Sequence, residues 1–229
     1  MLSARTAFEL HSLLKSINPE VPYPAEGRTQ QQVETYSIVR LLGSLSYSVD
    51  DFPLQLTKRE RPDFLVELGM RSIGVEHTEA TTENAAKEAF LRSKGHGPNI
   101  YSVHPMAIGE QRKTSSQLIV EIEADRPSPP WVGDSAEKGW ATAMAHFVAK
   151  KIATTHRSGY QLFEENWLLI YDSWNAPSLN HHRGLAKLIP LLQEAGAWKT
   201  FSKIFILDES LLLDISAGHP TFHCVNHCR

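Results

Sequence analysis

The segment from Arg61 to Ala80 constrains the fold of this chain most, because it sets acidic residues inside two apolar runs. The first run extends from Asp63 to Leu68 and the second from Ser72 to Thr78, and both are rich in β-branched and apolar residues. Gly69 supplies a turn signal between them. The pattern therefore predicts a β-hairpin.

The predicted turn sets the register of this hairpin. A two-residue loop places Asp63 directly opposite Glu76 on one face, with Cβ atoms roughly 4.5–5.5 Å apart. Two carboxylates that close repel each other, so we expect a cation between them. Mg²⁺ is the economical choice, since it takes oxygen ligands and is often held by only one or two carboxylates with water. The alternative is an ordinary hairpin with one solvated acidic face.

A further carboxylate lies on the apolar stripe of the helix predicted from Arg28 to Leu45. Glu34 precedes Ile38 by four residues and Leu41 by seven, which places all three on one helix face. A carboxylate on a core-facing stripe requires a partner. We therefore expect Glu34 to converge with the two hairpin carboxylates.

The hairpin resembles a known family signature. Pro62 and Asp63 at the start of the first strand, followed by Glu76, His77 and Thr78 at the end of the second, are similar to the motif of the PD-(D/E)XK nuclease superfamily, the restriction-endonuclease-like proteins. That family couples the hairpin to a preceding helix that often carries a further Glu. The resemblance covers residues 28–78 in its acidic positions.

The resemblance implies a fold and an activity. The fold is an α/β core with a mixed central sheet flanked by helices, here with extra helices and a long inserted loop. The activity is metal-dependent hydrolysis of phosphodiester bonds in nucleic acid, with DNA as the expected substrate. The cofactor is Mg²⁺ or Mn²⁺, held by Asp63, Glu76 and Glu34.

This chain departs from the family motif at Thr78, where the family has a lysine that positions or polarises the attacking water. A hydroxyl cannot supply that positive charge. Members of the family have moved the lysine to the helix after the central strands, here predicted from Ser135 to His156. We expect Lys138 to supply the missing positive charge, because it projects off the edge of the apolar stripe. Lys150 and Lys151 lie at the other end of the helix, so both ends cannot reach one metal. Other members have lost activity, so a catalytically inactive binding or regulatory module is the alternative.

The remaining sequence pattern predicts one α/β domain spanning residues 1–229. An N-terminal helix and a proline-rich break occupy residues 1–27, and an irregular insertion occupies residues 95–116. Alternating strands and helices in the second half imply parallel crossovers. Further strands are predicted at 46–57, 117–123, 166–172 and 201–207, and further helices at 82–94 and 182–195.

Composition excludes some classes of protein. The net charge of −3 argues against a surface coated in positive charge for nonspecific nucleic-acid binding, but not against a local basic groove. No apolar run approaches the ~20 residues that cross a bilayer, so no membrane partner is expected. Both cysteines fall in the last six residues, which predicts no disulfide framework and favours the cytoplasm. A homodimer is left open, as is a zinc site among His223, Cys224, His227 and Cys228.

Overall fold

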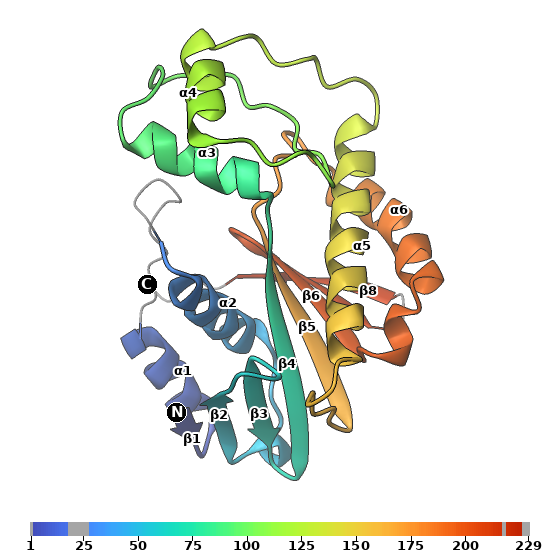
Figure 1. Cartoon of the computed structure of the whole chain (residues 1–229). Coiled ribbons are helices and arrows are strands. Elements are labelled where there is room, and N and C mark those ends of the chain that lie inside the picture. The colour runs from blue at the N-terminus through green and yellow to red at the C-terminus, as the bar shows by residue number, and fades with distance from the viewer. Residues whose placement is uncertain (1, 18–27, 217–218, 226–229) are drawn as a thin grey trace.

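The computed structural model describes residues 2–17, 28–216 and 219–225. Within these residues, eight strands form one sheet whose spatial order follows the chain from β1 to β8 (Figure 1). The predicted α/β fold, with a mixed sheet flanked by helices, is confirmed. The strands are β1 Leu2–Ala4, β2 Leu54–Lys58, β3 Phe64–Leu68, β4 Arg71–Ala80, β5 Glu165–Asp172, β6 Lys203–Asp208, β7 Leu211–Ser216 and β8 His219–Cys224.

The helices of the described residues are close to those that the sequence pattern predicts, with one addition. They are α1 Ala7–Ile17, α2 Gln30–Ser44, α3 Glu83–Ser93, α4 Ser115–Ala124, α5 Ser135–Thr155 and α6 His181–Glu194, with short 3-10 helices η2 Val49–Asp51 and η3 Ala197–Lys199. No helix in the described ranges is long and apolar enough to cross a membrane. The predicted proline-rich break at residues 18–27 lies outside the described residues.

Strand direction changes twice across the sheet. The strands from β1 to β4 are antiparallel, β4, β5 and β6 are parallel, and β6 to β8 are antiparallel again. The parallel pairs require long crossovers, and α5 and α6 supply helices for them. Strand β4 therefore has an antiparallel hairpin partner on one side and a parallel partner on the other.

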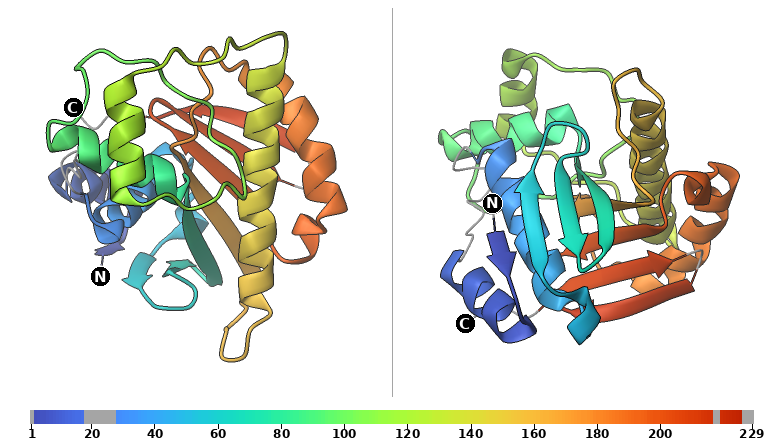
Figure 2. Two further views of the ribbon diagram at one scale, coloured as in Figure 1. Left: turned by 45° about the horizontal axis from the view of Figure 1, so that its top comes forward. Right: turned by 90° about the horizontal axis from the view of Figure 1, so that it is seen from below.

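Two helical layers cover the two faces of the sheet (Figure 2). Helices α1 and α2 pack on one face, over residues such as Val75 and Leu169. Helices α5 and α6 pack on the other face, over Leu168 and Ile170. Since neighbouring strand residues point to opposite faces, each buried strand contributes to both cores. We refer to these as the α2 face and the α5 face.

The predicted hairpin register is confirmed. Phe64 pairs with Val75 and Leu68 with Arg71, which sets Asp63, the residue before β3, against Glu76. Gly69 in the turn has φ +57°, and a Cβ there would collide with the carbonyl oxygen of Asp50. The turn therefore requires glycine for both its conformation and its close contact with η2.

Residues 117–123, predicted as a strand, are helical, so that prediction is wrong. They lie in α4, which begins with a capping box in which the side chain of Thr114 accepts from the Gln117 amide and the Gln117 side chain accepts from the Thr114 amide. Leu118 and Ile122, one turn apart, are buried against Leu91 of α3. Their spacing fits a helix as well as a strand, and the cap decides between the two.

The ends of the sheet also differ from the prediction. Strands β1 and β8 were not predicted, and β2 begins at Leu54 because η2 occupies part of the segment predicted as strand 46–57. His223 and Cys224 lie in β8, while His227 and Cys228 lie outside the described residues.

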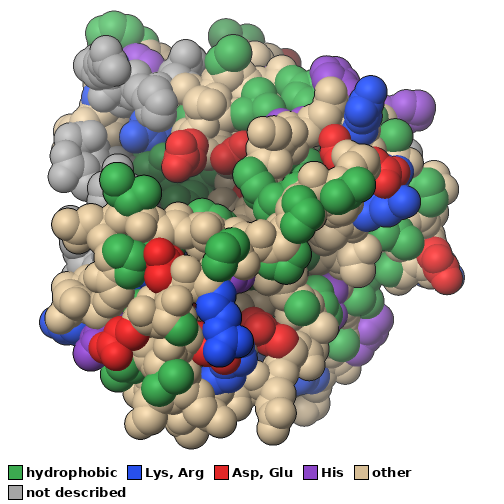
Figure 3. Space-filling view, turned by 90° about the horizontal axis from the view of Figure 1, so that it is seen from above, with side chains coloured by type: hydrophobic (Ala, Val, Ile, Leu, Met, Phe, Trp, Pro, Cys, Tyr) green, Lys and Arg blue, Asp and Glu red, His purple; other side chains and the backbone are tan. Residues whose placement is uncertain are grey.

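Helices α3 and α4 stand together beyond the carboxyl end of β4, joined by a segment without regular structure (Figure 1). We call residues 82–133, which connect β4 to α5, the cap. The predicted irregular segment within it is confirmed for residues 95–114, whereas residues 115 and 116 belong to α4. Seen from above, acidic, basic and apolar side chains are interspersed over this end of the molecule (Figure 3).

Candidate functional site

The hairpin carboxylates share one cation, and that cation is a lysine. Lys151 donates from Nζ to Glu76 Oε2 at 2.5 Å and to Asp63 Oδ2 at 3.4 Å. Asp63 lies just before β3, Glu76 lies on β4, and Lys151 comes from the last turns of α5. The repulsion expected between the two carboxylates is therefore relieved by an ammonium group of the chain itself.

The remaining contacts of these carboxylates come from neutral donors. Tyr160 donates its hydroxyl to Glu76 Oε1 at 2.8 Å, and the backbone N–H of His77 donates to Asp63 Oδ2 at 2.7 Å. Burial, and then the Glu76 charge, raise the pKa of the Tyr160 phenol, so it stays protonated as a donor. Both oxygens of Glu76 are engaged.

The site is buried enough for these contacts to matter. The Glu76 side chain is 5% exposed and that of Lys151 is 20% exposed. A charge at such depth is costly unless it is paired and hydrogen-bonded. Glu76, Lys151 and Asp63 therefore act as one charged cluster, and removal of Lys151 leaves both carboxylates uncompensated.

The α5 lysine that contacts the hairpin carboxylates is Lys151 and not Lys138, the lysine predicted from the sequence. Lys138 lies near the other end of α5, where its side chain is 66% exposed and pairs with Asp134 at 2.9 Å. Lys151 follows Phe147 by four residues and Val148 by three, so it continues the buried stripe of the helix. A charged residue in phase with an apolar stripe was the signal that identified Glu34, and the same signal identifies Lys151.

Glu34 does not join the two hairpin carboxylates, so the predicted convergence is wrong for this residue. Its place on the apolar stripe is confirmed, since it is 5% exposed. Its carboxylate accepts from Gln30 Nε2 at 2.7 Å and forms an ion pair with Lys58 at the end of β2. Helix α2 covers the face of the sheet opposite to α5, and the cation that pairs with Glu34 on that face is Lys58.

His77 lies on the α2 face, as strand alternation predicts. Its ring Nε2 is 3.1 Å from Ser37 Oγ on α2, and its side chain is buried. Burial lowers the pKa of the His77 imidazole to about 3, with the Asp63 carboxylate opposing that shift and the charges of Lys151 and Lys58 adding to it. His77 is thus a neutral, hydrogen-bonded residue of the packed core.

A second, half-buried acid lies on the α5 face at the end of β5. Asp172 accepts from Trp140 Nε1 at 2.6 Å and from the Trp174 backbone at 3.0 Å. Burial raises the pKa of the Asp172 carboxyl to about 6, although these two hydrogen bonds act in the opposite direction.

A cavity of about 1760 Å³ opens beside the site, between the cap and the layers that hold α2 and α5. It lies at the carboxyl ends of β4 and β5, the edge where ligands of parallel sheets bind. Thr78 lines this cavity, together with Lys150 and Lys151 of α5. Thr78 is therefore placed on the cavity side of the site, but without a charge.

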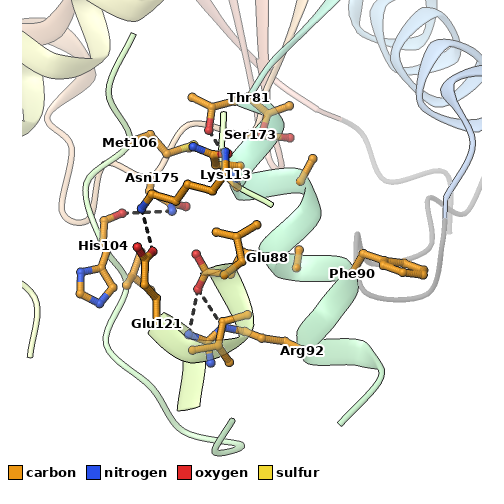
Figure 4. Close-up of a pocket in the computed structure, with 18 of the residues that line it drawn as sticks. Thr81, Glu88, Phe90, Arg92, His104, Met106, Lys113, Glu121, Ser173 and Asn175 are labelled. Carbon is orange, nitrogen blue, oxygen red and sulfur yellow. Dashed lines mark hydrogen bonds and ion pairs between the residues drawn. The ribbon is translucent and has the colours of Figure 1, made fainter. Parts of the chain in front are cut away.

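On the side of the cavity formed by the cap, charged side chains of the cap form ion pairs with one another (Figure 4). Lys113 pairs with Glu121 at 2.7 Å, and Arg92 pairs with Glu88 at 2.8 Å. Phe90 points away from these pairs in the same view. These four side chains of the cap are therefore paired with one another, while Arg126 of the cap also lines the cavity.

The donor set fits a small divalent cation at the position of the Lys151 ammonium. Two carboxylates reach that single position, and Mg²⁺ is commonly held by one or two carboxylates with water and substrate oxygens. Among the described residues, no group of three or more His, Cys, Asp and Glu side chains could hold a metal. Any metal here would depend on water and substrate for its other ligands.

No protein-family model, curated protein or solved structure matches this chain. The contacts among Asp63, Glu76, Lys151 and Tyr160 are therefore the basis for a functional proposal.

Proposed function

We propose that this protein is a metal-dependent nuclease that hydrolyses phosphodiester bonds in nucleic acid, with DNA as the expected substrate. One observation carries the proposal: Asp63 and Glu76 on paired strands direct carboxylate oxygens at a single cation position. The resemblance of the hairpin to the PD-(D/E)XK superfamily supports it. We also propose that the enzyme acts in the cytoplasm, as the cysteine pattern suggests.

Each residue of the cluster has a proposed role. Asp63 and Glu76 would hold Mg²⁺ or Mn²⁺, which when bound lowers the pKa of a water and stabilises charge on phosphate oxygens. Lys151 would supply the positive charge that Thr78 lacks, beside the attacking water or the phosphate. The water oxygen forms a bond to phosphorus as the bond to the leaving oxygen breaks. One proton leaves the water, and the leaving oxygen gains one from solvent.

The adjoining cavity supports a chain-like substrate. Its volume of about 1760 Å³ exceeds the roughly 300–1,000 Å³ of typical small-molecule pockets. Lys150 and Thr154 line it on the α5 side, next to Lys151. Lys150 forms no ion pair with any described residue, so it is available to a phosphate.

A specific observation favours a second candidate, a binding or regulatory module that has lost the chemistry. Lys151 and Tyr160 already satisfy the Glu76 carboxylate without a metal. In this case the cluster would serve as a structural ion pair.

Cleavage of DNA tests the first candidate. Purified protein is incubated with supercoiled and linear DNA in Mg²⁺ or Mn²⁺, and the products are resolved on gels. We expect cleavage by wild type and loss of cleavage in Asp63→Ala and Glu76→Ala. Glu67→Ala is the matched control, since Glu67 lies on β3 three pairs nearer the turn than Phe64 and should leave cleavage unchanged. Cleavage that persists in Glu76→Ala would identify a contaminant.

Calorimetry separates the two candidates. Mn²⁺ binding by wild type that is lost in Glu76→Ala supports the enzyme. Absence of divalent binding, together with a partner recovered by the wild-type protein, supports the module. Because calorimetry needs no substrate, the result does not depend on the choice of DNA.

A further inference from the structure

Each carboxylate of the candidate metal site has one oxygen engaged by a neutral donor of the fold. The Tyr160 hydroxyl occupies Glu76 Oε1, which leaves Oε2 as the oxygen that faces the cation position. The His77 backbone N–H donates to Asp63 Oδ2, which is also the oxygen that Lys151 contacts at 3.4 Å, so in Asp63 the amide and the cation position share one oxygen. Neither the hydroxyl nor the amide competes with a metal by charge, so both contacts can persist when a cation replaces the Lys151 ammonium.

The Tyr160 contact is held by the turn that precedes the residue. Helix α5 ends at Thr155, and the turn that follows is closed by a bond from the Tyr160 backbone N–H to the carbonyl of Arg157 at 3.3 Å. Gly159, with φ +81°, sets the direction of this turn. Lys151 and Tyr160 thus approach Glu76 from the same helix end, one at each oxygen.

From this geometry we propose that Tyr160 determines metal selectivity, by restricting Glu76 to a single metal-facing oxygen. The proposal rests on the metal site proposed above. Mg²⁺ and Mn²⁺ suit an octahedral shell built from single oxygens and water, whereas Ca²⁺ takes six to eight oxygens and often binds a carboxylate through both of its oxygens. A Glu76 with Oε1 occupied disfavours that second mode. Tyr160 is therefore a positioning residue that disfavours Ca²⁺.

Tyr160→Phe tests this directly, because it removes the hydroxyl and keeps the ring. Mn²⁺, Mg²⁺ and Ca²⁺ are titrated separately into wild type and variant by calorimetry in the absence of nucleic acid. We expect the ratio of Ca²⁺ affinity to Mn²⁺ affinity to rise at least about fivefold in the variant, the effect of one ordinary hydrogen bond on an equilibrium. A merely structural role would weaken all three ions together and leave the ratio unchanged.

The control is Tyr47→Phe, which also removes one tyrosine hydroxyl. Tyr47 donates to the carbonyl of Leu42, away from the site, so its loss should not alter the ratio. Thermal unfolding of both variants verifies that they fold. An unchanged ratio in folded Tyr160→Phe overturns this inference, while failure of wild type to bind any divalent ion overturns the proposed metal site itself.

Discussion

His77 and Glu76 are neighbours on β4, but their side chains lie on opposite faces of the sheet and differ in charge. On the α2 face, His77 is buried as a neutral ring beside Ser37. On the α5 face, Glu76 is buried against the Lys151 ammonium, and Asp172 is half-buried at the end of the adjacent strand, where it accepts from Trp140. Burial acts on all of these groups by the same physical effect, because it disfavours a charge.

The difference between the faces lies in how each group avoids an unpaired charge. His77 does so by staying neutral, Glu76 by pairing with a cation, and Asp172 by holding its proton to higher pH. At the Glu76 site the cation is Lys151, which also lines the cavity. Both faces contribute residues to the cavity wall, His77 and Glu79 from the α2 face and Thr78 and Lys151 from the α5 face.

Loss of the Lys151 charge should have the largest effect on the metal-free protein. Lys151→Met leaves Asp63 and Glu76 uncompensated, and breaking such a buried pair costs about 3 kcal/mol. Urea unfolding at pH 7 measures this loss. Saturating Mn²⁺ should return part of it, because a bound ion stabilises the folded state. Lys138→Met, at an exposed position on the same helix, is the control and should stay within about 0.5 kcal/mol of wild type. Equal stability of the two variants would contradict the cluster.

The α2 face should make the protein less stable as pH falls. The pKa of His77 is lowered to about 3, so the unfolded chain binds that proton more readily, and the contribution is lost as pH falls below about 6.5. At about 1.4 kcal/mol per pH unit, the loss between pH 6.5 and 5 is about 2 kcal/mol. Urea unfolding across this range should show a shallower slope for His77→Gln. Parallel slopes for wild type and variant would mean that His77 titrates normally.

Asp172 should oppose that trend. Its pKa is raised to about 6, so the folded state binds the proton more tightly, and its contribution to stability rises as pH falls from about 6 towards 4. Asp172→Asn keeps an acceptor for Trp140 and removes the titration. Between pH 6 and 5, the variant should lose about 1 kcal/mol more than wild type, since the folded carboxyl is already half protonated at pH 6. A variant that follows the wild-type curve would place the Asp172 pKa near its ordinary value.

The smallest expected effect belongs to the neutral partner on the α2 face. Ser37→Ala removes the hydroxyl beside His77 Nε2, which should cost about 1 kcal/mol at pH 7. Metal affinity measured by calorimetry should not change, since Ser37 lies on the opposite side of the sheet. A change in Mn²⁺ affinity would show that the two faces are coupled through β4.

The sequence pattern predicts those features of the structure that depend on interactions between residues near one another in the chain. The turn at Gly69 and strand alternation correctly predicted which residues oppose each other, and the apolar stripe correctly predicted that Glu34 is buried. Which face of the sheet α2 would cover depends on the packing of the whole chain, so the Lys58 partner of Glu34 was not predictable. The contact of Tyr160 joins a turn to a distant strand and carries no sequence signal. Lys151 did carry one, in its helical phase with Val148.

The tight turn of the β3–β4 hairpin has a consequence for insertions and deletions. Surface turns commonly tolerate a change in length, because loop closure costs little free energy. In this hairpin one added residue would shift the pairing by one and reverse the sides of every residue on β4. Glu76 would then face α2, and His77 would face Lys151. The length of this turn should therefore be as strongly constrained as the identity of Asp63 and Glu76. This holds although Met70 within the turn is fully exposed to solvent.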